Sequence, residues 1–145
     1  MKNLFKKICI ASDHAGFNLK EKIKDFLISK NISIIDLGPV NQNSVDYPDF
    51  AKKVSSRVKA NKSDIGILVC GSGTGMAISA NKTKGIRAAV CYNLKSTRLS
   101  RLHNNANIIS LGSRLTKKNI ALKLVSTFLK TKFEGGRHLK RVKKI

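Results

Sequence analysis

Short apolar runs rich in isoleucine and valine alternate along this chain with longer amphipathic segments. The apolar runs cover residues 8–11, 32–37, 65–70, 86–91 and 107–111. In the longer segments, apolar side chains recur every three or four residues, the spacing that places them on one face of an α-helix. The pattern therefore predicts five strands, with a helix after each.

Capping residues and turns indicate where several of these helices begin. A glycine-rich turn after the third run predicts a helix that starts near Gly75. Asn93 is a suitable N-cap for the fourth helix and Thr116 for the fifth, because their side-chain oxygens can accept a hydrogen bond from a free backbone N–H of the first turn.

Regular alternation of strands and helices is typical of the α/β class. Strands joined by helices lie parallel, and right-handed connections place helices on both faces of the sheet. We predict a three-layer α/β/α, Rossmann-like domain with a five-stranded parallel sheet. The chain has 145 residues, of which 41% are hydrophobic, and this length suits a single domain that spans residues 1–145.

Polar side chains follow three of the predicted strands. Asp13 and His14 follow the first, Cys70 ends the third, and Arg114 comes shortly after the fifth. Ligands of such sheets bind beyond the carboxyl ends of the strands, where these side chains meet. The sequence therefore predicts a site at this edge.

The charge of the chain is strongly unbalanced, since 29 Lys and Arg residues stand against 8 Asp and Glu residues and give a formal net charge of +21. Such a charge attracts polyanions, so a nucleic-acid-binding module is an alternative of a different class. However, the basic residues are spread along the chain, and aromatic residues make up only 6% of it. We therefore expect no specific nucleic-acid binding, and local anion binding by a few arginines.

The cysteines and the longest apolar runs bear on the compartment. Three dispersed cysteines argue against a disulfide framework and predict a reduced, cytoplasmic protein. No apolar run reaches about 18 residues and no secretory signal pattern follows the basic N-terminus, so we expect no membrane segment. No His or Cys spacing resembles a zinc site, so we expect no metal.

The segment from Cys70 to Gly75, CGSGTG, is the most informative one. Alternating glycines between a strand and a helix let backbone N–H groups hold a phosphate or a developing enolate oxygen, although a plain tight turn has the same appearance. The segment matches neither the Walker pattern nor Gly-x-Gly-x-x-Gly, which disfavours dinucleotide binding. A cysteine beside a helix N-terminus favours the reactive thiolate, whereas Cys9 and Cys91 fall in apolar runs and are expected in the core.

Histidines and arginines give weaker signals. His103 comes at the end of the fourth helix, where a histidine is more often structural or exposed than catalytic. Arg137 and Arg141 share a face if the basic tail, about residues 131–145, is helical, and they could then grip one anion. Spacing alone favours a solvated basic tail, or a nucleic-acid-binding arm, over such a grip.

Taken together, these segments resemble the type B ribose-5-phosphate isomerases, in the family that also contains subunits of galactose-6-phosphate isomerase. The resemblance covers nearly the whole chain and depends on the order and spacing of eight short segments. They are SDHAGF at 12–17, DYP at 46–48, CGSGTGM at 70–76, ANK at 80–82, GIRA at 85–88, SRLHN at 100–104, GSR at 112–114 and FEGGRH at 133–138.

The resemblance implies a role for each matching position. Cys70 would be the base that moves a proton between carbons 2 and 1 of the sugar. The enediolate would be held by backbone N–H groups of Gly71, Ser72, Gly73, Thr74 and Gly75. Ser72 stands where many members carry threonine and keeps the hydroxyl, which implies a part in catalysis. His103 would open the furanose ring and would come from the neighbouring subunit. The other implied contacts are those of Asp13 and Asn104 with the sugar, and those of His14, Arg114, Arg137 and Arg141 with the phosphate.

The same resemblance implies a reaction and an assembly. The expected activity interconverts D-ribose 5-phosphate and D-ribulose 5-phosphate through a cis-enediolate, within the pentose phosphate pathway and without cofactor or metal. A homodimer is expected, and dimers could pair into tetramers. Because the sequence does not measure pocket length, a hexose-6-phosphate isomerase acting on galactose 6-phosphate or allose 6-phosphate is the alternative within the family.

Overall fold

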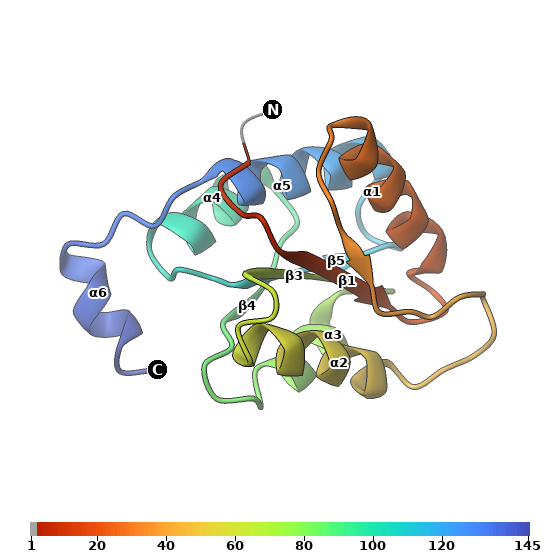
Figure 1. Ribbon diagram of the computed structural model, residues 1–145, viewed down its shortest axis with the longest axis horizontal. Coiled ribbons are helices and arrows are strands. Elements are labelled where there is room, and N and C mark those ends of the chain that lie inside the picture. Colours follow the sequence, from red (N-terminus) through yellow and green to blue (C-terminus); the bar gives the residue numbers. More distant parts are fainter. Residues whose placement is uncertain (1–2) are drawn as a thin grey trace.

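Figure 1 shows the computed structural model, which describes residues 3–145. Its strands form one parallel sheet in the order β2-β1-β3-β5-β4. They are β1 (Ile8–Ser12), β2 (Ile35–Asp36), β3 (Ile65–Cys70), β4 (Ala88–Val90) and β5 (Ile108–Gly112). The predicted five-stranded parallel sheet is confirmed. The sequence pattern does not determine the order of the last two strands, and the structure places β5 inside the sheet and β4 at its edge.

Helices cover both faces of the sheet. They are α1 (Phe17–Ser29), α2 (Tyr47–Lys59), α3 (Thr74–Ala80), α4 (Leu94–Leu102), α5 (Lys118–Lys130) and α6 (Arg137–Val142). Figure 1 shows α1, α4 and α5 above the sheet and α2 and α3 below it. The predicted three-layer α/β/α architecture is confirmed.

The core consists of two apolar layers because successive strand residues point to opposite faces of the sheet. On β1, Ile8 and Ile10 belong to the layer under α1 and α5, where the ring of Phe128 is fully buried. Cys9 and Ala11 belong to the layer over α2 and α3. The central strands are therefore held between two packed apolar layers.

Some element ends differ from the prediction. The edge strands β2 and β4 have two and three residues, shorter than the predicted runs, because each pairs with a single neighbour. Asn93 caps α4 as predicted, since its side chain accepts the N–H of Ser96 at 2.8 Å. The prediction for Thr116 is wrong: its N–H closes a turn on the carbonyl of Gly112, so the chain needs one further residue, the extended Lys117, before α5 begins.

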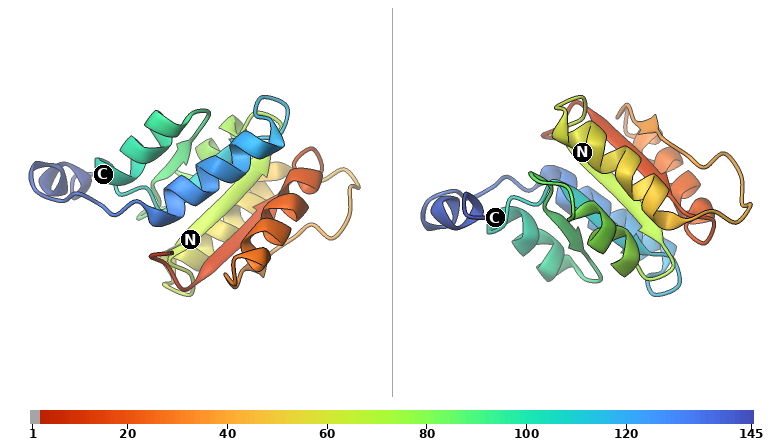
Figure 2. Two further views of the ribbon diagram at one scale, coloured as in Figure 1. Left: turned by 90° about the horizontal axis from the view of Figure 1, so that it is seen from above. Right: turned by 90° about the horizontal axis from the view of Figure 1, so that it is seen from below.

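The short helix α6 stands apart from the sheet at the end of an extended segment, residues 131–136, as Figures 1 and 2 show. We call residues 131–145 the arm. Part of this tail is helical, which is the condition under which Arg137 and Arg141 share a face. The arm touches the body where the ring of His138 packs on the ring of His103. No helix within residues 3–145 is long and apolar enough to cross a bilayer.

Candidate functional site

The carboxyl ends of the three central strands form a row. Ser12 pairs with Val69 and Cys70 pairs with Gly112, so Asp13, which follows Ser12, lies level with Cys70. The segments that follow β1, β3 and β5 are therefore side by side, as the sequence predicted. This edge forms the first half of the candidate site.

Cys70 ends β3 with 5% of its surface exposed. Its Sγ accepts the backbone N–H of Gly73 at 3.1 Å, an interaction that a thiolate makes more strongly than a thiol. Cys9 and Cys91 lie in the core as expected, and burial raises the pKa of both thiols, so they are protonated at neutral pH. Among the three free cysteines, Cys70 has the surroundings that suit a base.

The glycine-rich turn is packed so closely that side chains cannot be added to it. Gly73 has φ +80°, and a Cβ there would lie 3.0 Å from the backbone carbonyl carbon of Leu111. The carbonyl of Gly73 accepts the hydroxyl of Ser110 at 2.6 Å, which ties the turn to β5. On the other side, a Cβ on Gly75 would lie 2.5 Å from the ring of Tyr47. The turn is thereby fixed in place.

Asp13 and His14 are oriented by backbone groups. Asp13 is buried, and its Oδ1 accepts the N–H of Gly16 at 2.9 Å. His14 is half-buried, and its Nδ1 accepts the N–H of Val45 at 3.2 Å. Because Nδ1 is occupied as an acceptor, Nε2 is left as the donor of the ring. A carboxyl acceptor and an imidazole thus follow β1, the strand that pairs with β3.

Ser72 and Arg114 border the same turn. The Oγ of Ser72 accepts the N–H of Thr74 at 3.2 Å, which leaves the hydroxyl hydrogen free to donate. The guanidinium of Arg114 lies over Gly71, where a Cβ would be 3.0 Å from Nη1. The hydroxyl of Tyr92 donates to the carbonyl of Ser72 at 2.9 Å. Tyr92 was not predicted as a site residue, because a tyrosine in the loop after β4 carries no local sequence signal.

The other predicted site residues lie elsewhere: His103, Asn104, Arg137 and Arg141. Helix α4 leads from the carboxyl end of β4 back to the amino end of β5, so His103, which follows α4, lies at the opposite edge of the sheet from Cys70. Arg137 and Arg141 lie on α6, and Figure 2 shows α6 on the side away from the carboxyl ends. One chain therefore does not bring the two groups of predicted residues together.

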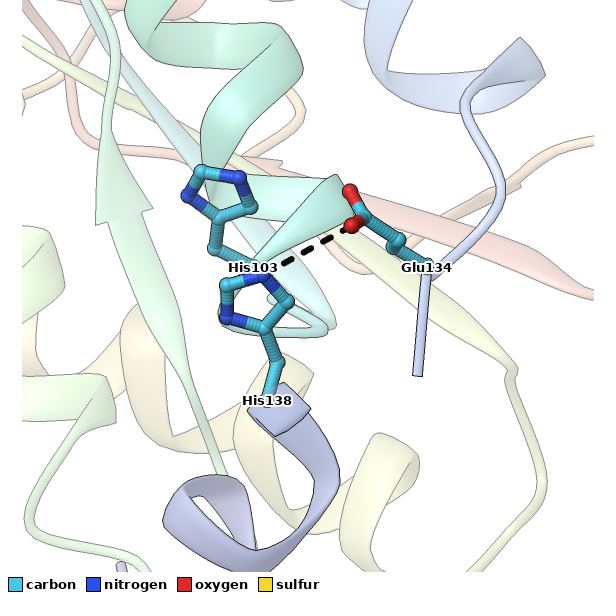
Figure 3. A group of neighbouring side chains, drawn as sticks. All are labelled: His103, Glu134 and His138. Atoms are coloured by element: carbon cyan, nitrogen blue, oxygen red, sulfur yellow. Dashed lines mark ion pairs between the residues drawn. The ribbon is translucent and has the colours of Figure 1, made fainter. Parts of the chain in front are cut away.

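His103, Glu134 and His138 form a cluster that joins the arm to α4, as Figure 3 shows. The two imidazole rings are stacked, with centroids 4.2 Å apart and planes 16° from parallel. Oε1 of Glu134 lies 3.8 Å from Nε2 of His138, and this nitrogen is buried without a hydrogen bond in the described chain. Burial, together with the nearby His103, lowers the pKa of His138, which favours the neutral form of the His138 ring.

The same cluster offers three ligand atoms within 4.8 Å of one another. Two imidazoles and a carboxylate form a ligand set that zinc uses. The lone pair of an imidazole nitrogen lies in the plane of its ring, and two nearly parallel planes direct their lone pairs past each other. One ring must leave the stack before both can bind one ion, so the expectation of no metal stays a prediction.

Comparisons with known proteins agree with one another. The family model described as Ribose/Galactose Isomerase matches residues 8–145. A Mycoplasma genitalium protein named "Probable ribose-5-phosphate isomerase B" is 47% identical over 141 residues, which cover 95% of this chain and 92% of that protein.

Two solved structures are similar over almost their full length. Ribose-5-phosphate isomerase B of Clostridium thermocellum has a TM-score of 0.94 and 52% identity, with 95% of this chain and 93% of that chain covered. Ribose-5-phosphate isomerase B of Mycoplasma genitalium, solved with bound ribulose-5-phosphate, has a TM-score of 0.91 and 46% identity, with 94% and 91% covered.

Proposed function

The chain belongs to the ribose/galactose isomerase family, and on that premise we propose that it interconverts D-ribose 5-phosphate and D-ribulose 5-phosphate with Cys70 as the base. The relative with bound ribulose-5-phosphate supports this substrate. The observation that carries the mechanism is the position of the Cys70 sulfur, which accepts the N–H of Gly73 at the mouth of a turn rich in backbone donors.

Isomerisation needs one base and a cradle for oxyanion charge. The thiolate of Cys70 removes the proton from carbon 2 of the open-chain aldose, a double bond forms between carbons 1 and 2, and the aldehyde oxygen takes the negative charge. A proton then moves between the two oxygens, and the thiol returns its proton to carbon 1, which leaves the carbonyl at carbon 2. N–H groups from Gly71 to Gly75 stabilise the intermediate more than the starting carbonyl, and this difference lowers the barrier.

The remaining roles follow the two halves of the site. Asp13 binds sugar hydroxyls, Ser72 donates its hydroxyl during ring opening, and His14 and Arg114 contribute donors for the phosphate. His103 acts as the acid and base of ring opening, Asn104 contacts the sugar, and Arg137 and Arg141 grip the phosphate so that binding energy positions the reacting carbons. These last four belong to the edge that is remote from Cys70 in the same chain.

We infer that a complete site forms between two chains. The projecting arm and the stack of His138 on His103 support this homodimer, because they hold the second set of residues together at the far edge of the molecule. A two-fold dimer that exchanges such residues has two equivalent sites. Pairing of dimers into tetramers remains part of the proposal.

Mixing of inactive variants tests the shared site. Cys70→Ala and His103→Gln dimers are each expected to be inactive. After subunit exchange at equal amounts, half of the dimers carry one chain of each kind, and each of these has one intact site, so about a quarter of wild-type activity returns. No recovery, in mixtures that native mass spectrometry shows to contain mixed dimers, would overturn the shared site.

The substrate is tested by parallel assays of ribose 5-phosphate, allose 6-phosphate and galactose 6-phosphate, with and without a chelator. We expect the highest kcat/KM for ribose 5-phosphate and no effect of the chelator. A clear preference for a hexose phosphate would replace the pentose by the alternative of the same family, and loss of activity with the chelator would overturn metal independence.

Three further expectations belong to the proposal. The chain acts as a single domain of residues 1–145, with the arm contributing to the phosphate site. Free, buried cysteines support a reducing compartment such as the cytoplasm. Nucleic-acid binding, if measured at physiological salt, should be weak and independent of sequence.

A further inference from the structure

A recess of about 600 Å³ lies at the amino edge of the sheet, opposite to the edge that carries Cys70. Much of its lining directly precedes strands: Lys6 and Lys7 come before β1, Asp64 before β3, and Arg87 before β4. Ligands of parallel α/β sheets usually bind at the carboxyl edge, so the isomerase reaction does not account for this recess.

The lining carries an excess of positive charge. Lys6, Lys7, Arg87 and Arg101 face the recess together with a single carboxylate, Asp64. Oδ2 of Asp64 accepts the backbone N–H groups of Lys6 at 3.3 Å and Lys7 at 3.1 Å. Within residues 3–145, no ion pair joins Asp64 to either arginine. Among the described residues, neither guanidinium group forms an ion pair with a carboxylate.

Arg101 is the more deeply placed of the two arginines, with 4% of its surface exposed. Its Nε donates to the carbonyl of Thr131 at 3.1 Å, and its Nη1 donates to Oδ1 of Asn105 at 3.1 Å and to the carbonyl of Ala106. All three acceptors are neutral. Burial, with a smaller effect from the charge of Arg87, lowers the pKa of Arg101 to about 10, so the group is still a cation at neutral pH. A buried cation without an opposite charge is costly.

Arg87 holds the other side of Asn105. Its Nε donates to the backbone carbonyl of Asn105 at 3.0 Å and its Nη1 to the carbonyl of Gly85 at 3.3 Å. Burial also lowers the pKa of Arg87. In the described chain, neither Arg87 nor Arg101 uses its Nη2 in a hydrogen bond. Each arginine thus has donors left for a ligand.

We propose that this recess binds the phosphate group of a small phosphorylated metabolite, or free phosphate, between Arg87 and Arg101. A dianion there supplies the missing counter-charge, relieves the repulsion between the guanidinium groups, and accepts hydrogen bonds from the planar forks that suit phosphate. Lys6 and Lys7 at the rim add long-range attraction. The general excess of lysines does not explain the two arginines of the recess, because a charge that is spread over the surface requires no buried arginine such as Arg101.

Titration calorimetry at low salt tests the proposal, with inorganic phosphate and glycerol 3-phosphate as probes. Arg137→Gln with Arg141→Gln serves as the background, because it removes the proposed grip of the isomerase site. We expect one phosphate per chain to bind this background protein. Adding Arg87→Gln should weaken binding about 10-fold, the loss of one charge-assisted pair. If inorganic phosphate binds and glycerol 3-phosphate does not, the ligand of the recess is free phosphate.

Arg98→Gln is the matched control, since Arg98 is an exposed arginine of α4 outside the recess, and its removal lowers the net charge by the same amount. Arg98→Gln should leave phosphate binding nearly unchanged, and Arg87→Gln alone should leave kcat/KM for the isomerase substrate unchanged. Absence of phosphate binding in the background protein, or equal weakening by Arg87→Gln and Arg98→Gln, would overturn the proposal.

Discussion

Replacing Gly73 by alanine tests whether the turn beside Cys70 must have its observed shape. Gly73 has φ +80°, and Gly85, in the loop before β4, has φ +88°. A Cβ on Gly73 would lie 3.0 Å from the carbonyl carbon of Leu111 and 3.2 Å from the nitrogen of Gly112, whereas a Cβ on Gly85 would meet no atom within 4 Å. Gly85→Ala is therefore a matched control with the same backbone strain and no crowding.

The expected losses follow from these contacts. In both variants, an alanine in the left-handed region lowers the free energy of unfolding by about 1 kcal/mol. The lower entropy of the unfolded chain offsets part of this loss in both. At Gly73 the backbone of β5 must also move by a few tenths of an ångström, which costs about 1–2 kcal/mol more. For 145 residues the unfolding entropy is about 0.3 kcal/mol/K, so the Tm of Gly73→Ala should lie roughly 3–6 °C below that of Gly85→Ala.

Activity separates the two variants further. In Gly73→Ala the N–H that Sγ of Cys70 accepts is displaced together with its neighbours, and kcat should fall about 100-fold. Gly85→Ala should keep wild-type kcat. Calorimetric melting and steady-state assays measure both effects. Equal Tm and equal kcat in the two variants would refute the view that close packing fixes the turn.

Two further predictions concern stability. Lys20 is fully buried, and its Nζ contacts Asp36 at 2.7 Å and the carbonyl of Pro39 at 3.0 Å. Lys20→Met should therefore lower the free energy of unfolding by about 3 kcal/mol. The more exposed Lys24→Met should lower it by about 1 kcal/mol or less, and urea unfolding measures both losses. Similar costs in both variants would contradict the importance of burial. Because burial lowers the pKa of His138, the unfolded chain takes up its proton first, near pH 6.5, and folding stability falls as the pH drops below that value. Between pH 7.5 and 5.5 the Tm of His138→Gln should therefore fall less than that of the wild type, and an equal fall would argue against a neutral His138.

Local patterns were sufficient for most of the fold. Short apolar runs predicted the strands, and apolar residues at every third or fourth position predicted the helices. The first pattern is typical of a buried strand and the second of an amphipathic helix. They could not give the order of β5 and β4, since either order buries the same side chains. The lengths of β2 and β4 were overestimated because pairing at an edge depends on a single neighbour, which local sequence does not encode.

Only part of the site was predictable in the same way. The rule that parallel strands end at one edge placed Asp13, Cys70 and Arg114 together. The position of His103 at the opposite edge follows from the direction of α4, which the residue types alone do not reveal. The His103–His138 stack and the hydroxyl contact of Tyr92 join segments that are distant in sequence, so no local pattern could have indicated them.

Comparison of Cys70→Ala with Cys91→Ala tests the assigned base most directly. Both variants remove one buried thiol, but only Cys70 accepts a donor from the glycine-rich turn. With ribose 5-phosphate in D₂O, kcat/KM of Cys70→Ala should fall about 1,000-fold and deuterium exchange at carbon 1 of the product should vanish, while Cys91→Ala keeps both. A folded Cys70→Ala protein that isomerises and exchanges at the wild-type rate would contradict the mechanism.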